Sequence, residues 1–121
     1  METQSKIAHR TLFIVSKGKG PGLENVKKFS KEMFERCLKN SCDKILADDK
    51  LQDNVLSDIE LFELGEYHAH IMPSIIRMAV VSKPAHLEKL KLWENVCVNR
   101  GANVKVFIND EDAEKWLNQT Q

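Results

Sequence analysis

Short strand-like segments alternate with longer helix-like segments along the whole chain. Apolar, often β-branched runs predict strands at residues 11–15, 42–47, 75–81 and 104–108. Apolar residues at helical spacing predict helices over 23–39, 57–72 and 86–99, and a short last helix that starts at Asn109 or Asp110. Connections of this length between successive strands are typical of an α/β protein with a largely parallel sheet and right-handed crossovers.

The expected architecture is one α/β domain that spans residues 1–121. A chain of 121 residues lies within the usual size of a single domain. The segment 75–81 is almost continuously apolar, which favours a strand covered on both faces. A weaker strand around Ile7 and Ala8 would add an antiparallel edge. The sequence therefore predicts a mixed, mostly parallel sheet of four to five strands with about four helices.

Charge and composition exclude several classes of function. The chain has 18 Lys and Arg against 18 Asp and Glu, so it lacks the cationic surplus of a general nucleic-acid binder. It has no apolar run long enough for an integral membrane segment, and its first residues do not resemble a signal peptide. The three cysteines form no Cys-x-x-Cys pair and are expected to be buried, reduced thiols. These features favour a cytoplasmic protein.

The last third of the chain carries the most distinctive motif. Arg100-Gly101 is followed by a valine-rich strand that ends in Phe107, and then by Ala113-Glu114-Lys115-Trp116-Leu117. This ordered combination resembles the SpoIIAA-like branch of the STAS fold (sulfate transporter and anti-sigma-factor antagonist). The residues that carry the pattern are Arg100, Gly101, Phe107, Ala113, Trp116 and Leu117.

The resemblance implies a small mixed sheet with helices largely on one side, and a protein without catalytic activity or cofactor. It implies a regulatory or binding domain that engages a protein partner or a small apolar ligand. Some relatives are switched by phosphorylation of a serine at a helix N-terminus, which makes Ser57 a candidate here. The Asp-Ser pair and the glycine of the usual phosphorylated segment are absent around Ser57.

Three local roles follow from the residues themselves. Ser57 and Glu60 have the spacing of a helix capping box, and the nearby acidic side chains would oppose a phosphate on Ser57. Trp116 is expected to seal the last helix onto the sheet. Arg100 is expected to pair with Glu94 or to bind carbonyls at the helix end, and Gly101 to take positive φ after that helix.

The helix 57–72 is expected to bury a stripe made of Leu61, Leu64, His68 and Ile71. Any apolar pocket is expected beneath this helix, which Gly65 weakens locally. The candidate ligand contacts are Phe62, Tyr67, Ile71 and Met72. The segment 57–76 carries four acidic residues and no Lys or Arg, so it would attract a basic partner surface.

Two other functions remain open. Asp48, Asp49 and Lys83 follow predicted strands, as in a phosphoacceptor or a small Mg²⁺-dependent enzyme. A structural homo-oligomer, such as a homodimer, is the other alternative. The segment 18–22 lacks the P-loop pattern and is interpreted as a turn. His68 and His70 are two residues apart on a helix and point in different directions, so no metal site is expected.

Overall fold

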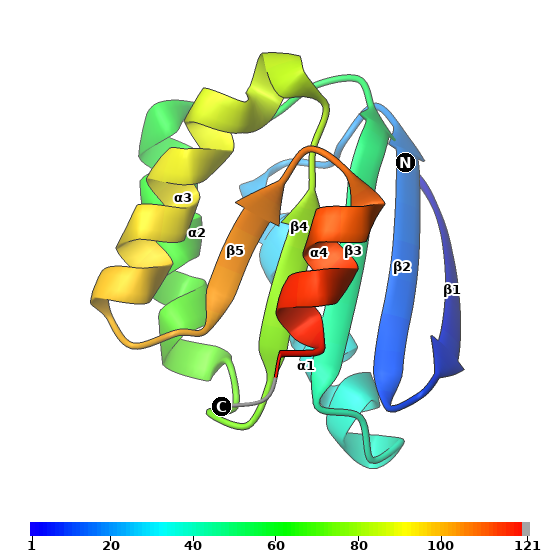
Figure 1. Cartoon of the computed structure of the whole chain (residues 1–121). Helices are drawn as coiled ribbons and strands as arrows, with labels where there is room; N and C mark the ends of the chain where they lie inside the picture. Colours follow the sequence, from blue (N-terminus) through cyan, green and yellow to red (C-terminus); the bar gives the residue numbers. More distant parts are fainter. Residues whose placement is uncertain (120–121) are drawn as a thin grey trace.

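The computed structural model describes residues 1–119, which form a five-stranded sheet and four α-helices (Figure 1). In chain order the elements are β1 (Glu2–Ala8), β2 (Thr11–Gly18), α1 (Leu23–Lys39), β3 (Lys44–Gln52), α2 (Asp58–Ile71), β4 (Arg77–Val81), the 3-10 helix η1 (Pro84–His86), α3 (Leu87–Asn99), β5 (Val104–Phe107) and α4 (Asp110–Leu117). The predicted alternation of strands and helices is therefore confirmed. No helix within residues 1–119 is long and apolar enough to cross a membrane.

The sheet has the strand order β1-β2-β3-β4-β5. β2 to β5 are parallel, and β1 is an antiparallel edge strand, as the weak pattern at Ile7 and Ala8 predicted. The β1–β2 hairpin turns through His9 and Arg10, which both adopt positive φ (52° and 63°). A tight turn with two positive φ values matches the right-handed twist of paired strands.

Strand alternation divides the core between the two faces of the sheet. The larger core lies under α1, α2 and α3 and contains Leu12, Ile45, Met78 and Trp93 among its buried residues. The smaller core lies under α4, which Figure 1 shows on the opposite face. Its buried residues are Leu46, Ala79, Val81, Ala113 and Leu117, with Phe13, Phe107 and Trp116 packed against them. Trp116 therefore covers the sheet as expected, and most helices share one side.

Two strand boundaries differ from the prediction. β3 continues through Asp48 and Asp49 to Gln52, where the sequence predicted a loop from Lys50 onward. Pairing with β2 supplies the backbone hydrogen bonds that override the low strand preference of aspartate. The ladder shifts register there, so that Asp49 and Lys50 together oppose one residue of β2. β4 begins only at Arg77, and Ile75 lies before it with 64% of its surface exposed.

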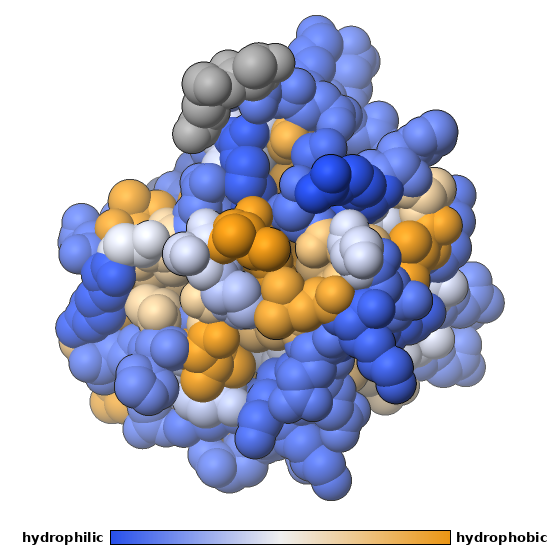
Figure 2. Space-filling model, turned by 90° about the horizontal axis from the view of Figure 1, so that it is seen from below, coloured by the Kyte–Doolittle hydropathy of each residue, from blue (hydrophilic) through white to orange (hydrophobic). Residues whose placement is uncertain are grey.

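The two ends of the sheet differ in character. Figure 2 views the end from which the parallel strands begin, where apolar residues form a broken band among hydrophilic ones. The exposed Ile75 belongs to the α2–β4 connection at this end. The parallel strands finish at the other end, which is where open α/β sheets usually bind ligands.

Candidate ligand-binding pocket

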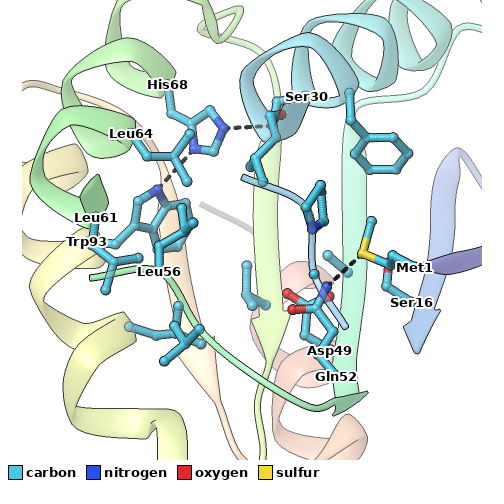
Figure 3. Close-up of a pocket in the computed structure, with 18 of the residues that line it drawn as sticks. Met1, Ser16, Ser30, Asp49, Gln52, Leu56, Leu61, Leu64, His68 and Trp93 are labelled. Carbon is cyan, nitrogen blue, oxygen red and sulfur yellow. Dashed lines mark hydrogen bonds between the residues drawn. The ribbon is translucent and has the colours of Figure 1, made fainter. Parts of the chain in front are cut away.

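A pocket of about 150 Å³ lies between the sheet and the three helices α1, α2 and α3, near the ends of β2 and β3 (Figure 3). Its lining is mostly apolar. The strands contribute Ile14, Ser16, Ala47, Asp49, Gln52, Met78 and Val80. The helices contribute Val26, Phe29, Ser30, Met33, Leu61, Leu64, His68, Leu90 and Trp93. The remaining lining residues are Met1, Gly20, Pro21, Asn54, Val55 and Leu56. We refer to this cavity as the Asp49 pocket.

The rim of the Asp49 pocket is built from the loops that follow β2 and β3. The amide of Gly20 donates a 2.7 Å hydrogen bond to Oδ1 of Asn54, and the amide of Asp53 donates to the carbonyl of Gly18 at 3.0 Å. Gly18 adopts a φ of 88°, a conformation that glycine takes without strain. The glycine-rich segment 18–22 thus forms a turn, as predicted, and two of its residues also line the pocket.

Asp49 places a carboxyl group on the pocket side of β3 (Figure 3). Burial, and secondarily the charge of the neighbouring Asp48, raise the pKa of Asp49 to about 7. Asp48 itself contacts Lys50, whose Nζ lies 3.1 Å from Oδ1 of Asp110 in α4. The adjacent carboxylates therefore point to opposite faces of the sheet, and Asp49 makes no ion pair within residues 1–119.

The wall of the pocket contains a chain of hydrogen bonds that joins three helices (Figure 3). Nε1 of Trp93 donates to Nδ1 of His68 at 2.9 Å, which leaves the imidazole proton on Nε2. Nε2 lies 2.8 Å from the Ser30 hydroxyl, which donates to the carbonyl of Val26 at 2.8 Å. Burial lowers the pKa of His68 to about 4. Both ring nitrogens are thus engaged, and His68 is neutral near pH 7.

The pocket lies beneath α2, but its α2 residues are not the four candidates taken from the sequence. Phe62 is 44% exposed beside the Arg100 guanidinium, and the Tyr67 ring faces the Lys27 ammonium at 5.4 Å. Ile71 and Met72 pack against the larger core. A ligand-binding role for these four residues stays a prediction.

Apolar residues at helical spacing were the sequence signal that identified the α2 residues lining the pocket. Leu61, Leu64 and His68 form the stripe that the sequence predicted to be buried, and all three line the cavity. On the strands the signal was weaker. Ser16 and Asp49 are polar residues that follow Ile14 and Ala47 at period two, so continued strands would have placed them on the core face.

The phosphoacceptor alternative is not supported by the positions of its carboxylates. It required Asp48 and Asp49 to share one ion, with Lys83 nearby. Because the strand continues through both residues, their side chains diverge to opposite faces. Within residues 1–119, no group of three His, Cys, Asp or Glu side chains is placed to hold a metal ion.

The capping box at the start of α2 is present. The Ser57 hydroxyl accepts from the Glu60 amide at 3.3 Å, and Oε1 of Glu60 accepts from the Ser57 amide at 3.1 Å. Ser57 is exposed, and its phosphorylation stays a prediction.

Arg100 binds a carbonyl at the end of α3, which was one of its two expected roles, but its acidic partner is not Glu94. Its Nη2 lies 3.1 Å from Oε2 of Glu66, and its Nη1 donates to the Val96 carbonyl at 3.4 Å. Glu94 instead accepts a 2.6 Å hydrogen bond from the backbone amide of Val106 on the edge strand β5. Gly101 has a φ of 93°, as predicted for the residue after a helix.

The acidic face of α2 is largely compensated by neighbouring elements. Glu63 pairs with Lys27 of α1, Asp58 with Lys89 of α3, and Glu66 with Arg100. The segment is acidic in sequence, but its surroundings supply the cations. This pairing weakens the expectation that the helix attracts a basic partner.

These features define an α/β domain with a mixed sheet, three helices on one face and one on the other. A solved structure described as an anti-sigma factor antagonist from Mycobacterium paratuberculosis is similar over 98% of this chain and 94% of that chain, with a TM-score of 0.68 and 9% sequence identity. The chain therefore has the STAS-like, SpoIIAA-like fold that the sequence motif implied. The sequence matches no protein-family model and no curated protein.

Proposed function

We propose that this protein is a non-catalytic binding module that holds a small, mostly apolar ligand in the Asp49 pocket. The pocket itself carries the proposal, because it is a largely apolar cavity of about 150 Å³. It lies near the carboxyl ends of parallel strands, which is where open α/β sheets usually bind ligands. An apolar cavity of this order accommodates a benzene-sized group. Phe29, Leu64 and Val80 supply the apolar surface that such a group would contact.

The polar groups of the pocket support binding rather than catalysis. His68 is the residue type most often used as a general base, but both of its nitrogens are held in the Trp93–Ser30 chain. Asp49 is the remaining ionisable side chain of the lining, and no second catalytic group faces it from the described side chains of the pocket. One carboxyl group in an apolar cavity is suited to orienting a ligand.

The direct test is an NMR titration of the amide resonances with benzyl alcohol. We expect saturable shifts at residues that line the pocket. Ala47→Leu fills the cavity from β3 and should abolish these shifts, whereas Ala85→Leu on the exposed η1 segment should leave them unchanged. Shifts that are scattered over the surface, or that survive Ala47→Leu, would contradict the proposal.

Binding of a protein partner is the second candidate. It is favoured by the fold shared with an anti-sigma factor antagonist and by the start of α2, where Ile59 is 82% exposed two residues after Ser57. Mass spectrometry of protein isolated from its own cells would test it. Native spectra would reveal a bound protein or a homodimer, and peptide spectra would show whether Ser57 carries a phosphate. A bare monomer without phosphate would argue against this role.

A further inference from the structure

We propose that the ligand of the Asp49 pocket carries a protonated amine, which binds the Asp49 carboxylate while its apolar part fills the cavity. This inference rests on the proposed function and names the chemical class of its ligand. It is argued from the polar atoms of the pocket, from the charges around them, and from the size of the cavity.

Most polar side chains of the lining are already engaged within the protein. Ser30 and His68 belong to the buried hydrogen-bond chain, and Oδ1 of Asn54 accepts from the Gly20 amide. Asp49 and Ser16 line the pocket from neighbouring strands and take no part in these contacts, although Ser16 is only 3% exposed. A buried polar group normally has a partner. Two acceptors on neighbouring strands thus point into the cavity, and a ligand that donates hydrogen bonds would satisfy both.

The surrounding charges favour a cation. Lys50, the nearest lysine in sequence, turns to the other face and contacts Asp48 and Asp110. His68 is neutral near pH 7, since burial lowers its pKa to about 4. Met1 also lines the pocket, but no ion pair joins its α-amino group to Asp49 within residues 1–119. Within residues 1–119 the Asp49 carboxylate is thus in no ion pair, and Asp48 adds a second negative charge on the same strand.

The charge of Asp49 should give amines, alcohols and carboxylates different affinities for the pocket. Burial disfavours the Asp49 carboxylate, and a cation bound against it would offset that cost. A neutral alcohol gains only an ordinary hydrogen bond, and a carboxylate ligand is repelled. A hydrogen bond between two charged groups is roughly twice as strong as one between neutral groups. The difference corresponds to about a tenfold gain in affinity for the amine.

The test compares three probes that share one ring: benzylamine, benzyl alcohol and benzoate. Calorimetry and amide shifts would measure their affinities for the wild-type protein at pH 8. We expect benzylamine to bind about tenfold more tightly than benzyl alcohol, and benzoate to bind most weakly. The affinity for benzylamine should fall as the pH is lowered from 8 to 6, because the pKa of Asp49 is raised to about 7.

Two variants test whether the preference for benzylamine depends on Asp49. Asp49→Asn keeps the shape of the side chain and removes its charge, so it should erase the preference for benzylamine and retain binding of benzyl alcohol. Asp48→Asn removes a charge from the same strand on the opposite face, and should keep most of the preference, because Asp49 remains to bind the amine. Thermal unfolding of both variants would verify that they fold.

The outcomes distinguish the two proposals. If benzyl alcohol binds in the pocket and benzylamine binds no better, or if Asp49→Asn keeps the preference, the inference about the amine is wrong and the binding function stands. If none of the three probes shifts the pocket residues, the proposed function itself fails. Tighter binding of benzoate than of benzylamine would reverse the inferred charge of the ligand.

Discussion

The indole of Trp93 donates a 2.9 Å hydrogen bond to Nδ1 of His68, and the two rings meet edge to face with centroids 5.7 Å apart. This contact joins α3 to α2, and the Ser30 hydroxyl extends the connection to α1. The three helices that cover one face of the sheet are therefore linked by a fully paired polar chain at the wall of the pocket. Such a chain specifies how the helices pack, because any displacement leaves a buried group without its partner.

The first prediction concerns pH. The pKa of His68 is lowered to about 4 in the folded protein, against its ordinary value of 6.5 in the unfolded chain. The unfolded state therefore takes up a proton first as the pH falls. Stability from the neutral imidazole is fully present above pH 6.5 and is lost progressively toward pH 4, by roughly 3 kcal/mol at most. Asp49 acts in the opposite direction over the same range, because its pKa is raised to about 7 in the folded protein. The His68 loss is therefore measured as a difference between variants in urea unfolding from pH 7.5 to 4.5.

Two glutamine variants isolate the contribution of His68 from that of the carboxylates. Relative to the wild type, the unfolding free energy of His68→Gln should rise as the pH falls from 6.5 to 4.5, because the variant lacks the group whose protonation favours the unfolded state. His70→Gln, at an exposed position of the same helix, should keep the wild-type slope. Equal slopes for the two variants would contradict the role assigned to His68.

The second prediction tests the far end of the hydrogen-bond chain. Ser30→Ala removes the acceptor of the His68 Nε2 proton and leaves a buried donor without a partner. We expect a loss of about 1–3 kcal/mol in the free energy of unfolding. Ser30→Thr keeps a hydroxyl at the position and serves as the control. If Ser30→Ala were as stable as the wild type, the imidazole would have another partner.

The order of the elements could be predicted from the sequence because α1 and α4 are strongly amphipathic, α2 starts at a capping box and ends before Pro73, and the parallel strands contain apolar runs. β1 was the weakest element of the prediction. Its residues are mostly polar and exposed, and it forms a strand through pairing with β2. The β3 extension has the same cause, since backbone pairing decides the structure of Asp48 and Asp49 against their local preference. Tertiary pairing of this kind leaves no periodic signal in the segment itself.

The candidate site was predicted less completely than the fold. The sequence placed a pocket beneath α2 and identified the buried stripe of Leu61, Leu64 and His68. Phe62 and Tyr67 were among its candidate ligand contacts, but their rings lie against Arg100 and Lys27. The hydrogen bond between His68 and Trp93 joins residues 25 positions apart, so no local sequence pattern predicts it.

The third prediction concerns the cap of α2. Ser57→Ala removes the hydroxyl that accepts from the Glu60 amide, and should cost about 1 kcal/mol of stability. Ser57→Asp restores an oxygen acceptor at the same position and should recover most of that loss. Chemical unfolding of the three proteins would measure both effects. An equal loss in the two variants would show that the capping hydrogen bond does not stabilise the helix.

The fourth prediction concerns Gly65, where α2 crosses α3. Alanine in place of glycine usually stabilises a helix by about 1 kcal/mol. Here a Cβ at position 65 would lie 2.8 Å from Cβ and Cγ1 of Val96 and 3.2 Å from the Trp93 carbonyl. Gly65→Ala should therefore destabilise the protein by roughly 1–3 kcal/mol, because the helices must separate. Thermal and urea unfolding would measure the change.

A double-mutant cycle identifies the cause of that loss. Val96→Ala removes Cγ1, the side-chain branch that the new methyl group would meet, and by itself costs stability through lost packing. If steric conflict between positions 65 and 96 is responsible, Gly65→Ala should be less harmful in the Val96→Ala background than in the wild type. The recovery should be incomplete, since Cβ of residue 96 and the Trp93 carbonyl remain close. Strict additivity of the two substitutions would show that the close approach of α2 to α3 is not what requires glycine.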